Sequence, residues 1–488
     1  FRGTGRPGVC LSTSGPGATN LVTGIANAYL DSVGMVAITC QVATTMVGTD
    51  AFQEIDITGV THSITKQNYF VENVQDLPRI VKEAFYIAST GRPGPVHIDI
   101  PVDVLKAEVK TFEYPKKINL LGYNPKKKIN NEKIKEAINL IKKSSRPIVL
   151  AGHGVLIAKA EAELKEFIEK NAIPMVNTLL GIGAIPESHP LNFGMLGMHG
   201  MTWANYAVYN ADLIIGVGLR FDDRITGKIS EFAKNADIIH IDIDEAEIGK
   251  NTIVKVPLLG DAKEVLEKLN KESVQKSRKK WISEIKKWRK ESKLEEVSAK
   301  GGSASGGKSS HAKVSAHLMV QDIVREICNK TKGKATIVAD VGQNQMWTAN
   351  FYDYSRPNQL LNSGGLGCMG YSLPAAIGAK MAKPKEAVWA LMGDGGLQMN
   401  IQELGTIKQE KLPIKIIVFN NGYLGMVRQW QELFFNKNYA HTKLDNPDFV
   451  AIACAYGIEA YKVKTWPEAK KKIAYANKTK NTIFLEFI

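Results

Sequence analysis

The sequence predicts an α/β protein made of three doubly wound parallel-sheet domains, the first of them incomplete. Short apolar runs typical of buried strands alternate with amphipathic helical segments along the 488 residues. Polar, glycine-containing turns follow several of these runs, at the position where α/β folds bind ligands. The length is sufficient for two to four domains that each bury a core.

The predicted elements divide the chain into five segments. The predicted strands are 8–13, 35–40, 96–100, 147–151, 174–178, 213–217, 237–243, 335–341, 388–392, 415–419 and 482–487, and the main predicted helices are 21–30, 77–90, 131–143 and 159–171. The segments are a first domain (1–110), a basic connector (111–130), a second domain (131–270), a charged helix with a Gly/Ser linker (271–317) and a third domain (318–488). Because the first domain starts on a strand, we expect its front to be missing.

Two polar turns in the third domain organise the functional hypothesis. Gly393-Asp394-Gly395 follows the apolar run 387–392, and Asn420-Asn421 follows the run 414–419. The segment 400–411 between them has helical spacing, which predicts a single βαβ unit. We therefore expect an aspartate carboxylate and an asparagine amide side by side at the carboxyl edge of a sheet.

Such oxygen donors suit a divalent metal that carries a diphosphate. Mg²⁺ prefers hard oxygen ligands in an octahedron and takes few of them from protein. Glycines at 393, 395 and 396 let backbone N–H groups approach phosphate oxygens. Each turn by itself is equally well explained as an ordinary turn. The pair, separated by the 24 residues 396–419, is the signature of thiamine-diphosphate enzymes.

Composition limits the classes of protein. The net charge is +14, but the lysines are spread over amphipathic helices and concentrate at 263–313 without a nucleic-acid-binding module, so we expect no nucleic acid partner. No run of 18 uncharged apolar residues occurs, which predicts no membrane span. The chain begins at Phe1, and we expect no signal peptide.

The five cysteines indicate a reducing compartment. They are odd in number and scattered, and they form no Cys-x-x-Cys pair, so we expect reduced core thiols and no metal site. They are Cys10, Cys40, Cys328, Cys368 and Cys454. This pattern predicts a cytoplasmic protein, or a plastid-stromal one if the source is eukaryotic.

With these pieces in place, the chain resembles the catalytic large subunit of acetohydroxyacid synthase, also called acetolactate synthase. The resemblance covers essentially all residues except the linker near 290–317. Its most specific stretches are Ser14–Asn20, Gly48–Glu54, Gly91–Pro95, Met195–Gly200, Arg220–Arg224, Gly364–Tyr371 and Gly425–Trp430. It implies a pyrimidine-binding, a central FAD-associated and a diphosphate-binding domain, with thiamine diphosphate, Mg²⁺ and FAD as cofactors.

The resemblance assigns cofactor contacts to individual residues. Asp394 and Asn421 would ligate Mg²⁺ by their side chains and Tyr423 by its backbone carbonyl. Met369 would lie under the thiamine, since methionine is apolar and adaptable. Gln343, Gly393, Gly395, Gly396 and Met426 would also contact thiamine diphosphate. Arg92, Met198, His199, Arg220 and Asp242 would contact FAD, and Gly218 and Ile243 are also assigned to cofactor binding. Gly152-His153-Gly154 resembles a dinucleotide fingerprint only in part, because the third glycine is absent.

The resemblance also implies a pocket for a second 2-keto acid. Arg224 would hold the carboxylate of this substrate in a charge-assisted pair, and Trp430 would form one wall. The pocket residues are Phe52, Gln53, Met198, Arg224, Val427 and Trp430, and the catalytic set is Gln53, Arg224, Met369 and Trp430. Simpler explanations stand beside these roles: a surface salt bridge for Arg224, core packing for Met369 and Trp430, and structural burial for His199.

The implied reaction has two stages. Pyruvate is decarboxylated on thiamine diphosphate, and the two-carbon unit is transferred to a second 2-keto acid, giving 2-acetolactate or 2-aceto-2-hydroxybutyrate. This is the first common step of branched-chain amino acid biosynthesis, and FAD takes no redox part in it. The family is active as a homodimer or homotetramer of catalytic subunits. Whether a regulatory small subunit binds stays open.

Departures from the family concern both ends of the chain. The family has a glutamate that protonates the aminopyrimidine, in a segment just before the position of Phe1, and Glu54 belongs to a different motif. Such a group contributes roughly 10²–10⁴-fold to rate. The carboxyl end stops at Ile488, without the tail that commonly closes over the site in the family. We therefore expect the chain to be truncated at both ends and poorly active as written. Ala43 replaces a usual proline, Val102 a frequent lysine, and Asn344 the centre of a common Gln-His-Gln.

Several alternatives remain at this stage. They are an FAD-free catabolic acetolactate synthase, a pyruvate oxidase, a related thiamine-diphosphate decarboxylase, and a paralogue that binds cofactor without turnover. Arg224 together with Trp430 favours carboligation, and bound flavin would argue against the catabolic enzyme.

Overall fold

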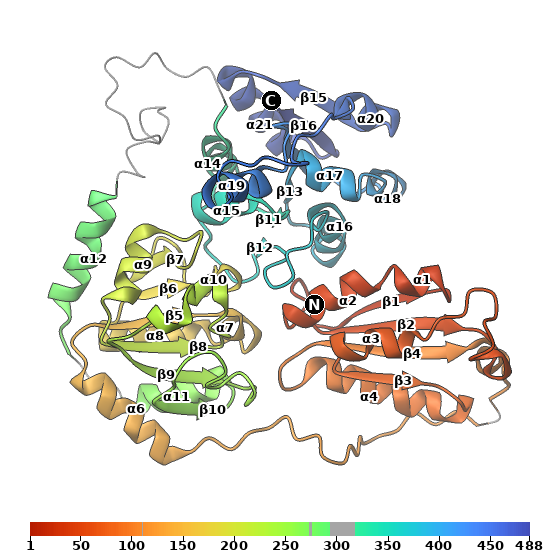
Figure 1. Ribbon diagram of the computed structural model, residues 1–488, viewed down its shortest axis with the longest axis horizontal. Coiled ribbons are helices and arrows are strands. Elements are labelled where there is room, and N and C mark those ends of the chain that lie inside the picture. Colours follow the sequence, from red (N-terminus) through yellow and green to blue (C-terminus); the bar gives the residue numbers. More distant parts are fainter. Residues whose placement is uncertain (110, 273–275, 293–317) are drawn as a thin grey trace. The chain divides into compact units, whose positions relative to one another are not determined.

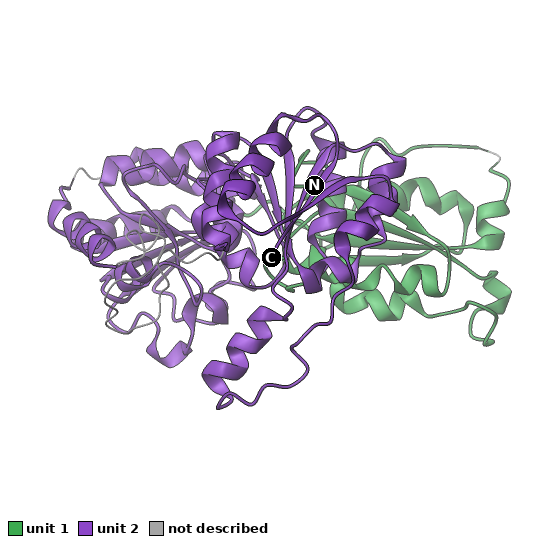
Figure 2. Cartoon of the chain, turned by 90° about the horizontal axis from the view of Figure 1, so that it is seen from above, with its two compact units in different colours: residues 1–127, 363–368 green, residues 128–362, 369–488 purple. Residues whose placement is uncertain are grey.

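Three parallel sheets, of four, six and six strands, form the frame of the chain (Figure 1). The computed structural model describes residues 1–109, 111–272, 276–292 and 318–488. Two compact units are distinguished (Figure 2): residues 1–127 with 363–368, and residues 128–362 with 369–488. The predicted α/β class with three parallel sheets is confirmed, and the first sheet is smaller than the other two.

The first unit contains the four-stranded sheet. Its strands lie in the order β1 (Gly8–Ser12), β2 (Met35–Gln41), β4 (Pro95–Pro101) and β3 (Gln67–Phe70). Every residue of β4 is buried, because the strand is central and covered on both faces. Helix α4 (Leu77–Ser89) starts with proline in its first turn, where no N–H partner is lost, and packs Ile80, Ala84 and Ile87 into the core.

A short loop from the far end of the sequence belongs to the same unit. Residues 363–368 lie against α2 (Val22–Leu30), whose C-terminal Asp31 is buried. The Asp31 carboxylate accepts hydrogen bonds from the backbone N–H groups of Gly364 and Gly365, at 3.2 and 2.6 Å. An ion pair of 3.0 Å with Arg2 balances its charge. These contacts explain why the loop groups with the first unit and not with its sequence neighbours.

The central sheet is doubly wound. Its strands lie in the order β10 (Val256–Leu259), β9 (Asp237–Asp242), β8 (Leu213–Val217), β5 (Pro147–Ala151), β6 (Met175–Asn177) and β7 (Asn192–Met195). Helices α6 (Asn131–Lys143), α8 (Glu161–Asn171) and α11 (Ala262–Lys271) cover one face, and α9 (Thr202–Tyr209) and α12 (Lys279–Glu291) the other. Strand order reverses between β5 and β8, which is where such sheets open a ligand crevice.

Helix α12 packs on the central sheet although its sequence is rich in lysine. Trp281 and Ile285, four residues apart on one face, are buried in the core beneath the sheet. The Trp281 indole N–H donates to the Pro147 carbonyl at 3.0 Å, and the buried Arg278 guanidinium donates to the Ile141 carbonyl at 2.7 Å. This packing differs from the prediction of a connecting segment at 271–317, because two buried side chains anchor the helix to the central sheet. The Gly/Ser linker at 301–307 lies outside the described residues.

The C-terminal sheet carries the two polar turns. Its strands lie in the order β12 (Leu360–Leu361), β11 (Thr336–Ala339), β13 (Val388–Gly393), β14 (Ile414–Phe419), β16 (Ile483–Phe487) and β15 (Glu459–Val463). One face packs on α14 (Val320–Thr331), α15 (Gln343–Phe351) and α21 (Trp466–Lys478), the other on α16 (Ser372–Ala382), α18 (Glu403–Gln409) and α20 (Phe449–Ala455). The strand order reverses between β11 and β13.

Two expectations from composition can be compared with the structure. All five cysteines are free, as predicted, but the expectation that they are core thiols is wrong for most of them. Cys328 is buried, whereas Cys454 is exposed on α20, which buries its Phe449 and Ala453 instead. Among the described residues, no helix is long and apolar enough to cross a membrane.

Candidate active site

The Gly-Asp-Gly and Asn-Asn turns meet at one edge of the C-terminal sheet. Strands β13 and β14 pair in parallel with Gly393 opposite Phe419, so the residues that follow them leave the sheet together. The backbone N–H of Gly422 donates to Asp394 Oδ2 at 2.9 Å. The sequence-based expectation that the two turns lie side by side thus agrees with a direct contact between them.

Asp394 has the surroundings of a carboxylate that needs a cation. It is 1 % exposed, and burial raises the pKa of its carboxyl group while hydrogen bonds from Asn446 and from backbone N–H groups oppose that rise. Its Oδ2 partners, the Asn446 amide at 2.7 Å and the Gly422 N–H, are neutral. A buried carboxylate with neutral partners is stabilised by a nearby cation. The residues at this edge therefore fit a divalent metal.

The remaining oxygen donors come from the exposed turn after β14. Asn421 Oδ1 accepts the Tyr423 N–H at 3.0 Å and has a second lone pair. Among the described residues no group of three His, Cys, Asp or Glu side chains is placed to hold a metal alone. One carboxylate, one amide and a backbone carbonyl are nevertheless the few protein ligands that Mg²⁺ takes when phosphate and water supply the rest.

Close contacts from neighbouring side chains explain two of the glycines of the turn. A Cβ at Gly396 would lie 2.6 Å from Asp340 Oδ1, and a Cβ at Gly395 would lie 2.7 Å from Leu424 Cδ2. The Met369 methyl group is 3.4 Å from the same Gly395 position, so Met369 lies over the turn. Larger residues at 395 or 396 would displace these neighbours. Gly393 differs, because the space around its missing Cβ is open.

Sequence reasoning missed Asp340, which lies on the other side of the β11–β13 switch point. Asp340 directly follows β11 and is fully buried, and burial raises the pKa of its carboxyl group. It accepts backbone N–H groups of Gly370 and Ser372 at 3.0 and 2.8 Å, and so holds the loop that carries Met369. An acidic residue directly after an apolar strand was the available signal, and the same pattern identified Asp394.

Gln343 lies beside the start of α19 (Gly425–Phe434), as the expected cofactor contacts require. Its Nε2 donates to Gln429 Oε1 at 2.9 Å, and a Cβ at Gly425 would lie 2.3 Å from Gln343 Oε1. Met426 is the next residue of this helix. Gln343 and Met426 thus come from different helices to the same part of the C-terminal domain.

Three of the predicted substrate-pocket residues come together. The Arg224 guanidinium lies 5.5 Å from the centre of the Trp430 ring, and its Nη1 is 3.4 Å from Met198 Sδ. An ion pair of 3.5 Å with Asp223 leaves the guanidinium about half exposed. A cation stacked on an indole keeps its N–H edge available for a carboxylate. Val427, one turn before Trp430, is exposed on the same helix.

The other two predicted pocket residues, Phe52 and Gln53, belong to the first unit. Gln53 has φ = 62°, a left-handed conformation that costs a non-glycine residue energy. Gly15 lies against it, and a Cβ there would be 2.8 Å from the Gln53 carbonyl oxygen. Phe52 is exposed. Glu54 accepts the Gly48 and Ala51 N–H groups at 2.5 and 3.3 Å, which ties it to its own loop.

Most of the remaining predicted cofactor residues surround the switch point of the central sheet. Gly218 has φ = 61°, and a Cβ there would lie 2.4 Å from the Gly154 Cα, so the loops after β5 and β8 touch through glycine. Asp242 ends β9, next to β8, and Ile243 follows it. Arg220 pairs with Asp222 at 3.3 Å. The predicted contacts Gly218, Arg220, Asp242 and Ile243 thus lie on two neighbouring strand ends.

Two further predicted FAD contacts lie elsewhere. His199 accepts a hydrogen bond from Asn350 through its backbone carbonyl at 2.9 Å, and burial followed by the nearby Arg224 charge lowers the pKa of its imidazole. Arg92 is in the first unit, where its Nε donates to the Ser32 hydroxyl at 2.9 Å. Nothing in the structure assigns a ligand to either residue.

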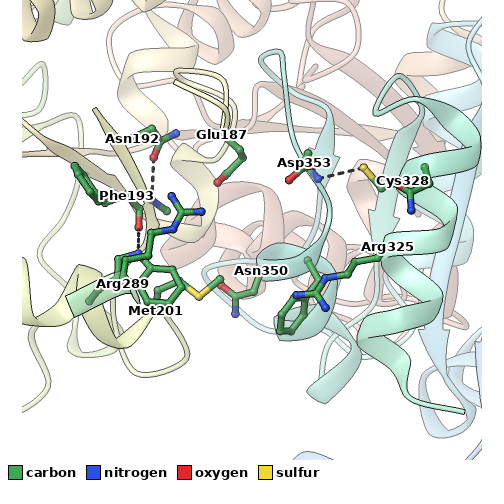
Figure 3. A pocket seen from close by; sticks show the side chains of 13 residues that line it. Glu187, Asn192, Phe193, Met201, Arg289, Arg325, Cys328, Asn350 and Asp353 are labelled. Carbon is green, nitrogen blue, oxygen red and sulfur yellow. Dashed lines mark hydrogen bonds between the residues drawn. The ribbon is translucent and has the colours of Figure 1, made fainter. Parts of the chain in front are cut away.

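A separate cavity of about 290 Å³ lies between the central and C-terminal sheets of the second unit (Figure 3). Glu187 and Arg289 line it from the central side, and Arg325, Asn350 and Asp353 from the C-terminal side. None of the predicted site residues lines this cavity. It is therefore distinct from the strand-end site.

Comparison with known proteins identifies the family. Three models of thiamine pyrophosphate enzymes match the chain: the N-terminal TPP binding domain over residues 1–60, the central domain over 134–269 and the C-terminal TPP binding domain over 340–487. The acetolactate synthase large subunit of Buchnera aphidicola is 44 % identical over 99 % of the chain and 84 % of its own length.

The chain belongs to the acetolactate synthase large-subunit family.

Other members of the family give the same result. The acetolactate synthase large subunit of Corynebacterium glutamicum is 47 % identical over 99 % of the chain and 77 % of its own length. The chloroplastic acetolactate synthase 1 of Oryza sativa is 45 % identical over the whole chain and 75 % of its own length. Within the family models, Asp340, Asp394 and Asn421 all fall in the C-terminal TPP binding domain.

Proposed function

We propose that the chain is the catalytic subunit of an acetolactate synthase. It would decarboxylate pyruvate on thiamine diphosphate and transfer the two-carbon unit to a second 2-keto acid, giving 2-acetolactate or 2-aceto-2-hydroxybutyrate. The contact between the Gly-Asp-Gly and Asn-Asn turns carries the proposal, because it lies in the domain that matches the C-terminal TPP binding model. The names of the family members supply the product, acetolactate.

Particular residues would hold the cofactors. Asp394, Asn421 and the Tyr423 carbonyl would ligate Mg²⁺, because they are hard oxygen donors at one strand edge. Gln343, Met369, Met426 and the glycines at 393, 395 and 396 would contact thiamine diphosphate, which supplies an electron sink for carbanion chemistry.

The central domain would hold FAD. Its candidates, besides Arg92 of the first unit, are Met198, His199, Gly218, Arg220, Asp242 and Ile243. The strand order of the central sheet reverses between β5 and β8, where such sheets bind ligands, and this supports the assignment. Formation of one acetolactate and one CO₂ from two pyruvate molecules involves no net oxidation, so the flavin would serve a structural role.

Arg224 and Trp430 would select the second substrate. The guanidinium edge would bind the acceptor carboxylate, and the indole would both support the guanidinium and form an apolar wall. Met198 completes the same group of side chains. A decarboxylase without carboligation needs no such second carboxylate site, so this cluster favours transfer over simple decarboxylation.

We also propose the organisation of the chain and its partners. Residues 1–110, 131–270 and 318–488 would be the pyrimidine, central FAD-associated and diphosphate domains. The catalytic subunits would form a homodimer or homotetramer, and the names of the relatives, which specify a large subunit, support a regulatory small subunit as partner. Light scattering of the purified protein, alone and with a co-expressed candidate small subunit, tests this assembly.

The reaction is tested by product analysis. Purified protein with pyruvate, thiamine diphosphate, Mg²⁺ and FAD should release one CO₂ per acetolactate formed, and omission of Mg²⁺ should abolish both products. Acetaldehyde or acetyl phosphate as the main product would contradict the proposal. Flavin absorbance that co-purifies with the protein would separate this enzyme from an FAD-free catabolic acetolactate synthase.

A further inference from the structure

Two N–H donors connect the ends of β13 and β14 by bridging the same pair of oxygen atoms. The Asn446 Nδ2 lies 2.7 Å from Asp394 Oδ2 and 3.1 Å from Asn420 Oδ1. The Gly422 N–H lies 2.9 Å from Asp394 Oδ2 and 3.2 Å from Asn420 Oδ1. Neither Asn420 nor Asn446 is among the proposed metal ligands. Together they set the distance between the Asp394 carboxylate and the turn that carries Asn421 and Tyr423.

The bridge requires that the Asn420 amide has a single orientation. Its oxygen accepts both N–H donors, so its Nδ2 must point away from them. There Nδ2 donates to Glu486 Oε1 at 2.7 Å. An ionised carboxylate only accepts hydrogen bonds, and it therefore excludes the flipped amide, in which the Asn420 oxygen would face Glu486. Glu486 thus determines which atom of Asn420 faces Asp394.

Glu486 is itself held rigidly. It is 1 % exposed and lies in β16, the strand next to β14, where it is paired with Val418, two residues before Asn420. The Asn420 N–H donates to the Phe487 carbonyl at 2.9 Å, which adds a backbone link at the same level. On the far side, Lys462 Nζ lies 3.7 Å from Glu486 Oε2 and 3.5 Å from Asp448 Oδ2. The cation compensates the buried charge of Glu486.

We propose that Glu486 and Asn446 are positioning residues that pre-form the metal site by clasping the Asp394 carboxylate to the Asn420–Gly422 turn. The inference rests on the proposed binding of Mg²⁺ and thiamine diphosphate at this edge. Outer partners that orient metal ligands change metal affinity by about 10–100-fold when removed. The clasp consists of protein groups only, so it is present before the cofactor arrives.

Cofactor binding tests the clasp without reference to activity. Calorimetric titration of thiamine diphosphate at a series of Mg²⁺ concentrations gives the Mg²⁺ level needed for half-maximal binding. Glu486→Ala and Asn446→Ala should each raise that level by about 10–100-fold. Glu486→Gln retains an acceptor oxygen for Asn420 Nδ2 but also carries an N–H donor that can pair with the flipped amide, so its Mg²⁺ requirement should lie between those of wild type and Glu486→Ala. In the double variant, the fold-rise of the Mg²⁺ requirement should be smaller than the product of the two single fold-rises, because both residues act through Asn420.

Glu386→Ala provides a matched control. Glu386 also ties polar groups of the C-terminal sheet together, since its Oε2 accepts from Thr336 Oγ1 and pairs with Arg356 Nη2, both at 2.6 Å. It precedes β13 and is therefore at the opposite edge of the sheet from Asp394. This variant should lower the unfolding temperature and leave the Mg²⁺ requirement unchanged. An equal rise of the Mg²⁺ requirement in Glu386→Ala would overturn the positioning role, because general loosening would explain both results.

Two outcomes separate the failure of this inference from the failure of the proposed function. If wild type shows Mg²⁺-dependent binding and folded Glu486→Ala has the same Mg²⁺ requirement, the clasp is refuted and the cofactor assignment stands. If wild type does not bind thiamine diphosphate at any Mg²⁺ concentration, the proposed function is wrong and the clasp with it. Circular dichroism of every variant establishes that the compared proteins are folded.

Discussion

The charge of Asp394 is the residue-scale feature on which the proposed metal site depends. The side chain is almost fully buried, and its side-chain partner is a neutral amide. Burial of an ionised group without an opposite charge costs free energy. The protein tolerates this cost at a turn that also carries glycines in close contact with neighbouring side chains, as expected for a site that gains its cation from a ligand.

The substitution Asp394→Asn separates charge from shape. We expect Mg²⁺-dependent binding of thiamine diphosphate to weaken by more than about 100-fold, beyond the effect of an outer partner. The unfolding temperature should stay the same or rise, because the amide still accepts the Gly422 and Asn446 donors while the buried charge is gone. Calorimetry measures the first and thermal unfolding the second. Wild-type cofactor affinity in Asp394→Asn would remove Asp394 from the metal site.

Trp430 has a consequence for substrate choice. Its ring lies under the Arg224 guanidinium, so Trp430→Leu would loosen the carboxylate-binding group and widen the apolar wall. We expect the preference for 2-ketobutyrate over pyruvate to fall. The two acceptors differ by one methylene group, which limits the discrimination between them to about 1–3 kcal/mol. A competition assay of both acceptors measures the product ratio.

The control for Trp430 is a second tryptophan that makes the same kind of contact. Trp466 begins α21 and has the Lys470 ammonium 5.3 Å from its ring centre. It follows the edge strand β15, which β16 separates from β14. Trp466→Leu should leave the product ratio unchanged. If both variants give the wild-type ratio, Trp430 does not line the acceptor pocket.

At the scale of elements, α12 is a helix whose charged composition gives no indication that it packs on the core. Eight of its thirteen residues are charged, yet Trp281 is 2 % exposed and its indole satisfies the Pro147 carbonyl. Trp281→Ala should lower the free energy of unfolding by about 3–5 kcal/mol, the range for buried tryptophan truncations. Urea denaturation measures the loss.

Trp281→Phe provides the graded comparison for this helix. The variant keeps most of the apolar contact but leaves the buried Pro147 carbonyl without its donor, so it should lose about 1–3 kcal/mol. A loss below about 0.5 kcal/mol for Trp281→Ala, the level of a surface substitution, would mean that α12 does not pack stably on the central sheet in solution.

Elements with long apolar runs could be predicted from the sequence, and short or partly polar ones could not. Strands β5, β8 and β13 are apolar runs buried on both faces, and β14 is one except for the buried Lys415. The missed strands are β3, β7, β10, β12 and β15, which have two to five residues, too few for periodicity to separate them from loops. Helix α12 was assigned to the connector because its lysines outnumber its two core residues.

The same limit applies to the candidate site. Asp394 and Asn421 could be proposed because Asp394 directly follows β13 and Asn421 comes two residues after the end of β14. Asn446 and Glu486 could not, because they come from a loop and a strand 52 and 66 residues away from their partners Asp394 and Asn420. Only the order of strands in the sheet brings them together. Local sequence therefore predicts the candidate ligand-binding groups, and tertiary structure identifies the residues that hydrogen-bond to them.

At the scale of the whole molecule, the second unit joins two sheets across a seam that contains a carboxyl pair. The backbone N–H of Glu187 donates to the Tyr354 carbonyl at 2.9 Å. The side chains of Glu187 and Asp353 both line the cavity of Figure 3. Burial, followed by the nearby Asp353 charge, raises the pKa of Glu187 to about 8, and Arg289 opposes the rise. The raised pKa favours the protonated form of Glu187 at neutral pH.

This raised pKa makes stability depend on pH in a defined direction. An unfolded chain releases the Glu187 proton near pH 4.5, whereas the folded chain retains it until about pH 8. Between these pH values the unfolded state binds fewer protons than the folded state, so the free energy of unfolding falls as pH rises. The contribution of Glu187 is therefore complete below about pH 4.5 and is lost by about pH 8, with an upper limit of about 5 kcal/mol from 1.36 kcal/mol per pKa unit.

Glu187→Gln removes the titrating proton and keeps a polar side chain of similar size. The variant should equal wild type in stability near pH 5 and exceed it increasingly up to about pH 9, because only the wild type then has a buried charge beside Asp353. Urea midpoints across this range measure the difference. Asp353→Asn removes the second cause of the raised Glu187 pKa. In this variant the pH range over which wild-type stability falls should therefore end at a lower pH. Wild-type and Glu187→Gln curves that run parallel over the whole range would show that Glu187 is ionised in the folded protein.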